Sequence, residues 1–119
     1  MNLFNILSNG QKNRKTFVKT PFSKKNWVVL DLLLANGFIK GFFKDNYSIF
    51  VFLEYQKGSG FVSIKQISSP GKPVYSSCSK LFHYKKGLGT LIISTPKGVM
   101  TDRDARFNQL GGKMLCSIY

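Results

Sequence analysis

The order of helix-like and strand-like segments restricts the fold of this chain more than any other feature of its sequence. Residues 24–36 follow Ser23, a good N-cap residue, and precede Gly37, which supplies the left-handed conformation that ends many helices. Apolar residues recur here at helical spacing, with Trp27, Leu30 and Leu34 at i, i+3 and i+7 and Val28 and Leu32 beside them. We therefore predict a helix that packs this apolar face on a sheet.

Strands are predicted directly after this helix, at residues 38–43, 47–55 and 61–67. In the second of them, one face carries Tyr47, Ile49, Val51, Leu53 and Tyr55, and the other carries Phe50 and Phe52. Apolar residues on both faces predict a strand that is covered on both sides. The glycines of Gly58-Ser59-Gly60 predict a hairpin connection to the third strand.

The segment before the helix is basic. A short helix is expected at residues 3–7, with Asn9-Gly10 as its stop. Four cations then follow in a stretch almost without acidic residues: Lys12, Arg14, Lys15 and Lys19. This stretch is either a solvated loop or a set of phosphate contacts. Together, the first 66 residues are expected to form an α-β-α-β-β layer.

Helical periodicity nearly disappears after residue 67. Pro and Gly make residues 68–73 a rigid loop, and strands are predicted at residues 74–75, 91–94 and 113–119. Thr101 with Asp104 three residues later resembles a capping box, so one short helix is expected before Gly111-Gly112. The predicted fold class is α+β, with an N-terminal α/β domain at 1–66 and a small β-rich C-terminal domain at 67–119.

Charge restricts the partner. The chain has 18 Lys plus Arg against five acidic residues, a formal net charge of +13, and an excess of this size suits a polyanion. A membrane surface is disfavoured because no lipidation motif, long basic amphipathic helix or run of about 18 apolar residues is present. The two cysteines, Cys78 and Cys116, are expected to be reduced thiols.

Catalysis is not expected. His83 has no obvious carboxylate partner and no cysteine at metal-ligand spacing. Asp102 and Asp104 lie next to Arg103 and Arg106, so capping and local pairing are favoured over a magnesium site. Gly87-Leu88-Gly89 lacks the third glycine and the strand and helix of a dinucleotide site. We therefore expect no enzyme activity, metal, cofactor or small-molecule substrate.

The most informative segment is residues 94–106, which run from an apolar strand through a turn of small residues and lysine into a capped helix. Such a turn displays hydroxyls, backbone N–H groups and a cation with little side-chain bulk around them. These groups suit the sugar and phosphate oxygens of a nucleic acid.

Several segments, in order, carry a family resemblance: Asn9-Gly10-Gln11, Asn36-Gly37-Phe38-Ile39, residues 67–75, Gly87-Leu88-Gly89, residues 94–106, and Gly111-Gly112 followed by Cys116. Together they resemble the bacterial and organellar type of small-subunit ribosomal protein eight. The resemblance implies a structural component of the small ribosomal subunit that binds the central domain of small-subunit ribosomal RNA and supports assembly. Neighbouring small-subunit proteins are then expected partners.

The expected RNA-binding residues are Ser94, Thr95, Pro96, Lys97, Gly98, Lys72, Tyr75, Lys113, Lys12, Arg14, Lys15, Ser23 and Lys24. The hydroxyls and amides of the turn are expected to read the wide, shallow minor groove of RNA. Tyr75 is either a nucleotide-stacking residue or a core tyrosine.

The chain departs from the family pattern at several of its positions. Pro96 replaces the usual Ser, which removes one hydroxyl and stiffens the loop. Lys113 replaces the common Glu, which permits phosphate pairing. Ile6 and Ser8 stand where the first helix of the family usually carries arginines, so Lys12 to Lys15 are expected to compensate.

Two questions stay open from the sequence. One is function, because a basic RNA- or DNA-binding module outside the ribosome is the alternative, although no helix-turn-helix or zinc module is recognisable. The other is location. The resemblance begins almost at Met1, and the chain is rich in Phe, Lys, Asn and Ile, as AT-rich coding DNA would produce. We expect a protein of the mitochondrial ribosome in the matrix, with a plastid as the alternative and a bacterium third.

Overall fold

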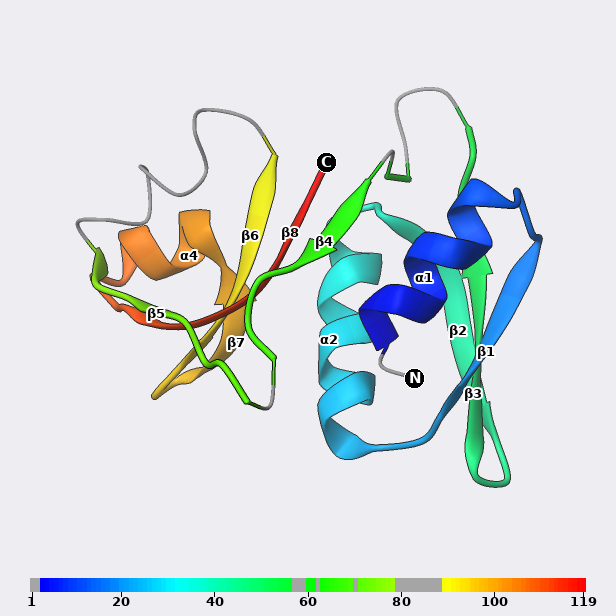
Figure 1. Cartoon of the computed structure of the whole chain (residues 1–119), viewed down its shortest axis with the longest axis horizontal. Coiled ribbons are helices and arrows are strands. Elements are labelled where there is room, and N and C mark those ends of the chain that lie inside the picture. Colours follow the sequence, from blue (N-terminus) through cyan, green and yellow to red (C-terminus); the bar gives the residue numbers. More distant parts are fainter. Residues whose placement is uncertain (1–2, 57–59, 62, 70, 79–88) are drawn as a thin grey trace. The chain divides into compact units, whose positions relative to one another are not determined.

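A computed structural model describes residues 3–56, 60–61, 63–69, 71–78 and 89–119 (Figure 1). The chain divides into two compact units, Met1–Val62 and Ser63–Tyr119. One contains a three-stranded sheet of order β1-β3-β2, and the other a five-stranded sheet of order β4-β8-β6-β7 in which β5 also pairs with β8. All strand pairs are antiparallel, which confirms the predicted α+β class.

The N-terminal unit has the predicted α-β-α-β-β order. Its elements are α1 (Leu3–Lys12), β1 (Phe17–Pro21), α2 (Lys24–Ala35), β2 (Ile39–Asp45) and β3 (Ser48–Leu53). The predicted stop at Asn9-Gly10 is wrong, because α1 continues to Lys12. Gly10 lies inside the helix where any side chain would collide with Val18 of β1, so it permits a close approach of helix and strand. The last cation of the basic stretch, Lys19, lies in strand β1.

Both helices cover one face of the first sheet (Figure 1). The middle of this inner face is formed by the buried residues Ile49, Val51 and Leu53 of β3. Over it lie buried side chains of the two helices: Leu3 and Leu7 from α1, and Val29, Leu30 and Leu33 from α2. Ser23 caps α2 and Gly37 has a φ of +79°, both as predicted. The predicted apolar face of α2 is wrong except at Leu30, which is buried, since Trp27, Val28 and Leu34 are exposed. Trp27 instead packs its ring edge on Phe42, at 4.7 Å between centroids.

The outer face of this sheet carries Phe17, Phe43, Phe50 and Phe52. The prediction that β3 is covered on both sides is wrong, because no described element lies over these rings. Phe17 is 47% exposed and Phe43 is 48% exposed. The four rings pack on one another instead, with centroid distances of 5.2 to 5.9 Å.

The C-terminal unit contains β4 (Ile64–Gln66), β5 (Tyr75–Ser76), β6 (Thr90–Thr95), β7 (Gly98–Thr101), α4 (Asp102–Phe107) and β8 (Gly112–Ile118). The predicted strand at 61–67 belongs here and not to a hairpin with β3, since β4 pairs with β8 through Ile64 and Ile118. Strand β7 was not predicted. The short helix and the three predicted C-terminal strands are present, with shifted ends.

One face of the second sheet is buried under α4. Leu91, Ile93 and Met114 form a core cluster with Ala105 of the helix. The register between β6 and β8 shifts after Ile92, which faces Cys116, whereas Ile93 faces Met114. This irregularity places Met114 in the core and its neighbour Lys113 on the opposite face. No helix in the described part of the chain is long and apolar enough to cross a membrane.

Candidate nucleic-acid interface

The turn between β6 and β7 is held by the side chain of Thr95. Its hydroxyl donates to the carbonyl oxygen of Gly98 (2.8 Å) and accepts from the N–H of Lys97 (3.2 Å). Thr95 is only 8% exposed, whereas Pro96, Lys97 and Gly98 are exposed at the tip. Gly98 has a φ of +122°, which side-chain-bearing residues rarely adopt. The tip therefore presents one cation and backbone polar groups on a fixed frame.

A row of residues crosses the sheet next to this turn. Tyr75 pairs with Lys113, Lys113 with Ser94, and Ser94 with Val99, so their side chains share one face. This face is opposite to the one that α4 covers. Tyr75 is 68% exposed, which excludes the alternative of a core tyrosine. We call Tyr75, Lys113 and Ser94 the cross-sheet row.

The glycine pair lets the strands of this row approach closely. A side chain at Gly112 would collide with the carbonyl oxygen of Ser94, and one at Gly111 would collide with the backbone of Ser76 and Ser77. Both positions therefore require glycine, which explains the pair that the sequence shows before β8.

Lys72 lies in a tight turn before β5. The N–H of Lys72 donates to the carbonyl oxygen of Ser69 (3.0 Å), and the N–H of Ser69 donates to that of Lys72 (3.2 Å). Ser68 is buried and its hydroxyl accepts from the N–H of Val74 (2.8 Å). These bonds fix the loop that leads into Tyr75 and leave the Lys72 side chain exposed.

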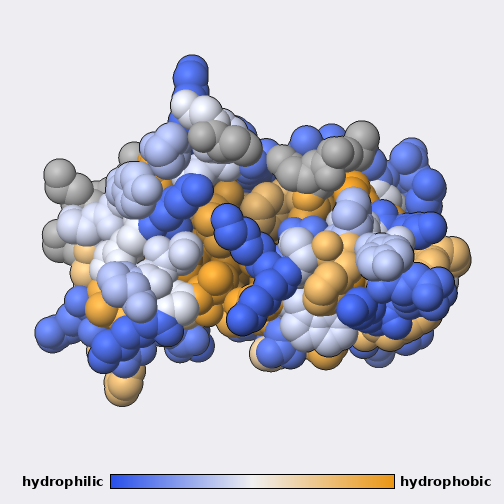
Figure 2. All heavy atoms as spheres, turned by 90° about the horizontal axis from the view of Figure 1, so that it is seen from below, coloured by the Kyte–Doolittle hydropathy of each residue, from blue (hydrophilic) through white to orange (hydrophobic). Residues whose placement is uncertain are grey.

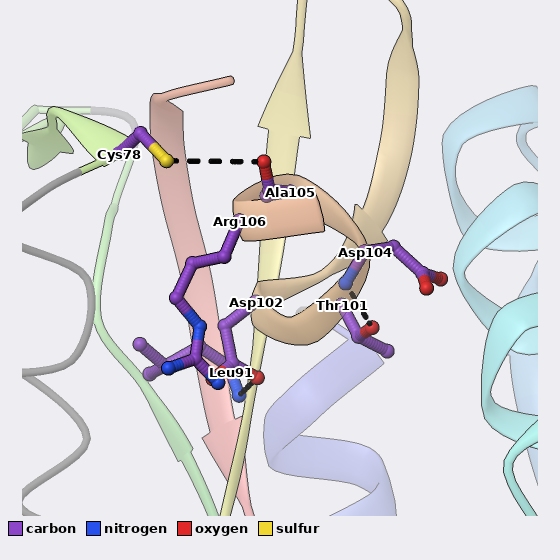
Figure 3. Close-up of polar contacts among 7 residues, drawn as sticks. All are labelled: Cys78, Leu91, Thr101, Asp102, Asp104, Ala105 and Arg106. Atoms are coloured by element: carbon purple, nitrogen blue, oxygen red, sulfur yellow. Dashed lines mark hydrogen bonds and ion pairs between the residues drawn. The ribbon is translucent and has the colours of Figure 1, made fainter. Parts of the chain in front are cut away.

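Helix α4 anchors the other end of the hairpin (Figure 3). The Thr101 hydroxyl accepts from the N–H of Asp104 (3.3 Å), which confirms the predicted cap. The carboxylate of Asp102 is buried, accepts from the N–H of Leu91 (3.2 Å), and lies 3.6 Å from the Arg106 guanidinium. Local pairing is thus confirmed for Asp102, whereas the cap of α4 is Thr101. Within the described ranges no group of three or more metal-ligating side chains occurs. His83 and Gly87 lie outside those ranges.

The N-terminal unit holds a second cationic region. A groove of about 800 Å³ runs between the end of α1 and β1, and its lining contains no carboxylate: Ile6, Asn9, Gly10, Asn13, Arg14, Lys15, Thr16, Phe17, Val18 and Lys19. We call this the basic groove. Hydrophilic residues are spread over the visible face of both units (Figure 2). Sequence reasoning found the cations but not the hollow between them.

Tyr55 fixes the turn that carries two of these cations. Its hydroxyl donates to the carbonyl oxygen of Lys15 (2.6 Å), and the Arg14 guanidinium lies 4.6 Å from its ring centroid. Burial raises the pKa of Tyr55 and the charge of Arg14 opposes this rise, so the phenol remains a hydrogen-bond donor at neutral pH. Arg14 itself has a φ of +50°. Sequence reasoning did not identify this role of Tyr55.

The remaining predicted residues lie elsewhere in the units. Lys12 is exposed at the last turn of α1 but does not line the basic groove. The Ser23 hydroxyl accepts from the N–H of Asn26 (3.1 Å) and serves as the cap of α2. Lys24 is exposed beside a separate hollow of about 220 Å³, lined also by Phe22, Trp27 and Lys44.

Comparison with known proteins gives consistent matches over the chain. The sequence profile described as "Ribosomal protein S8" matches residues 1–119. The "Small ribosomal subunit protein uS8" of Rhizobium rhizogenes is 40% identical over 119 aligned residues, covering 95% of this chain and 90% of that protein. Proteins of the same name from Sinorhizobium medicae (39%) and Rhizobium meliloti (40%) match with the same coverage.

Proposed function

The chain belongs to the ribosomal protein S8 family, and from this premise we propose that it binds the central domain of small-subunit ribosomal RNA and supports assembly of the small subunit. The observation that carries the proposal is that the β6–β7 turn follows directly on Ser94, so that the turn and the cross-sheet row lie next to each other in the sheet. One sheet end thereby presents a hydroxyl, two cations, exposed backbone and an aromatic ring: Ser94, Lys97, Lys113, residues 96–98 and Tyr75.

These groups match the chemistry of an RNA minor groove, which is wide and shallow and displays 2′-hydroxyls and base edges. Ser94 and the backbone of residues 96–98 exchange hydrogen bonds with sugars and base edges. Lys97 and Lys113 neutralise flanking phosphates, and Lys113 lies directly between Ser94 and Tyr75 in the pairing register. Tyr75 stacks on a nucleotide at the margin of the contact. Thr95 supports the turn from within.

The exposed cations of the other segments supply affinity without sequence selection. Lys72 adds charge in the loop before Tyr75, while Arg14 and Lys15 in the basic groove, with Lys12, add phosphate contacts in the N-terminal unit. Lys24 adds a further charge at the start of α2, positioned by the Ser23 cap. The proposed partners are small-subunit RNA and neighbouring small-subunit proteins, and the proposal requires no cofactor or substrate.

We propose an organellar ribosome as the location, in the mitochondrial matrix before a plastid. The support is compositional, because Phe, Lys and Asn are abundant, as AT-rich coding DNA would produce. The relatives named above are bacterial, and each carries a small-subunit name.

Sedimentation tests this proposal. A lysate of purified organelles is separated on a sucrose gradient, and the protein is expected with small subunits and with their RNA after immunoprecipitation. Purified chain is also expected to bind a transcript of the central domain more tightly than a shuffled transcript of equal length. Recovery only from RNA-free fractions, or equal affinity for both transcripts, contradicts the ribosomal role and favours a basic module that acts elsewhere.

A further inference from the structure

The outer face of the first sheet combines aromatic rings with cations. In the pairing register, Phe17 faces Phe52 and Phe52 faces Gly41, while in the next row Lys19 faces Phe50 and Phe50 faces Phe43. The two outermost rings, Phe17 and Phe43, are about half exposed, and the inner two are more buried. We call the surface formed by Phe17, Phe43, Phe50 and Phe52, with Lys19 and Gly41 in the same rows, the phenylalanine face.

The rings have free surface at both sides of the sheet. Phe43 stacks on Phe50 with a centroid distance of 5.2 Å and an interplanar angle of 16°. Phe17 is tilted against Phe50 and Phe52 at 5.9 Å from each. Since β1 and β2 are the edge strands, the outward surfaces of Phe17 and Phe43 meet no further strand. An aromatic ring of a ligand can therefore extend the stack at either side.

A hollow interrupts this face at the glycine position. It measures about 210 Å³ and is lined by Thr16, Lys40, Gly41, Phe52 and Leu53. A Cβ atom built on Gly41 meets nothing within 4 Å, so the backbone here is open. A planar group is thus able to lie against the strand beside Phe52, within reach of the Lys40 side chain.

Charge indicates what this face binds. The Lys19 ammonium lies 5.8 Å from the Phe50 centroid, and Phe17 and Lys19 also line the basic groove with Arg14 and Lys15. The aromatic surface and the phosphate-binding surface are therefore continuous. The carboxylate of Asp45 lies at the far end of the face, in the row of Ser48. An uncharged apolar partner would have to desolvate Lys19 and Lys40 without pairing them, which is costly.

We propose that the phenylalanine face binds a short unpaired segment of RNA, with bases stacked on Phe17 and Phe43 and the sugar-phosphate backbone following Lys19 into the basic groove. Aromatic rings with flanking cations on a sheet suit single-stranded nucleic acid, because every base has a stacking surface. The inference rests on the proposed RNA-binding function but concerns a different surface and a different form of RNA. The contact is sequence-tolerant, in contrast to the reading of a helix by the cross-sheet row.

Matched variants of the full chain separate stacking from charge. Phe43→Leu keeps an apolar side chain without an aromatic surface, and Phe43→Tyr restores the ring. Tyr47→Leu is the control, since Tyr47 is 90% exposed in the β2–β3 turn, outside the paired rows that carry the rings. The probes are a fluorescein-labelled uridine decamer, a fully paired RNA duplex and the central-domain transcript. The single tryptophan, Trp27, reports unfolding of each variant.

Phe43→Leu is expected to weaken decamer binding by roughly fivefold to a hundredfold, the range for loss of one stacked base. Phe43→Tyr and Tyr47→Leu are expected to bind the decamer like the unaltered chain, and duplex affinity should change by less than about twofold. Lys19→Gln should lower the steepness of the salt dependence for the decamer by about 0.7 in the slope of log K against log salt, and Phe43→Leu should not.

Unchanged decamer affinity in a folded Phe43→Leu variant overturns the inference. So does a Phe43→Leu variant that keeps all RNA affinities yet no longer associates with small subunits, because the face then contacts protein. An unaltered chain that binds the central-domain transcript but not the decamer leaves the proposed function standing and refutes the inference alone. Failure to bind the transcript removes the proposed function itself.

Discussion

A single hydroxyl organises the tip of the β6–β7 hairpin. Thr95 both donates to Gly98 and accepts from Lys97, and its side chain is almost fully buried. These bonds occupy the hydroxyl inside the turn. We therefore propose that RNA recognition by this hairpin rests on the groups that Thr95 positions, which are the Ser94 hydroxyl and the exposed backbone of residues 96–98.

Replacing Thr95 tests this division of roles. Thr95→Val keeps the shape but removes the hydroxyl, so we expect the free energy of unfolding to fall by about 1–2 kcal/mol, because two backbone groups lose a partner. Thr95→Ser should retain most of the stability, and Ser94→Ala should stay within about 0.5 kcal/mol of the unaltered chain. Urea unfolding and affinity for the central-domain transcript are measured together. A Thr95→Val variant of full stability with lost RNA affinity would instead assign the hydroxyl to RNA.

The two thiols differ in environment. Cys116 is buried, and burial raises its pKa to about 12, whereas Cys78 is partly exposed near Ala105. Because the thiolate is the reactive form, Ellman's reagent at pH 8 is expected to modify Cys78 at once and Cys116 only on unfolding. Above the ordinary thiol pKa of about 8.5, the unfolded chain ionises and the folded chain does not, so stability should fall as the pH rises. Immediate reaction of both thiols would contradict the burial of Cys116.

Elements with local signals were predicted well, and elements that depend on distant partners were not. Ser23 and Gly37 mark α2 because caps act within one turn. The buried side of α2 was misassigned since apolar residues surround this helix, and periodicity then selects no single face. Strand β4 pairs with β8, at least fifty positions away, and no local signal indicates that partner.

The same reasoning explains what sequence could find of the interface. Ser94, Lys113 and Tyr75 were named from segments far apart, and pairing with β8 brings them into one row. The phenylalanine face was missed because a continuous run of apolar residues describes a strand covered on both sides and a strand with open rings equally well. The difference depends on whether another element covers the face, and β3 itself carries no signal of that.

Helix α4 depends on a buried carboxylate. Asp102→Ala leaves the N–H of Leu91 and the Arg106 guanidinium without this acceptor, so we expect a loss of about 1–3 kcal/mol in the free energy of unfolding. Asp102→Asn keeps an oxygen for Leu91 and should lose less. Chemical denaturation of the three proteins supplies the comparison, with Asp31→Ala on the exposed side of α2 as the control. Equal stability of all variants would show that the cap alone holds α4.

At the scale of the whole molecule, we expect net charge to set the strength of binding to any polyanion and the geometry of the site to set its selectivity. A net charge of +13 attracts any polyanion, whereas we propose that the cross-sheet row and the β6–β7 turn select among RNA structures. The cations of the proposed contacts are all at least partly exposed: Lys12, Arg14, Lys15, Lys72, Lys97 and Lys113. Exposed cations release counterions when they meet phosphates, which makes the affinity sensitive to salt.

We therefore expect affinity for the central-domain transcript to fall on the order of a thousandfold between 50 and 200 mM salt, the scale for about six phosphate contacts. Fluorescence anisotropy titrations across this range give the slope. Lys65→Ala removes a charge from β4, outside the proposed contacts, and should weaken cognate and unrelated RNA alike and only slightly. A flat salt response would show that these cations do not contact phosphate.

The place of β8 in the second sheet sets an order of events during synthesis. Strands β4, β5 and β6 leave the ribosome before β8, with which each of them pairs, whereas the N-terminal unit has all its described strands once Leu53 has emerged. The first unit is thus able to fold while translation continues, and the second waits with open strand edges. The nascent chain acquires its row of Tyr75, Lys113 and Ser94 only after Lys113 is free to pair, so the surface that we propose for RNA binding is completed last.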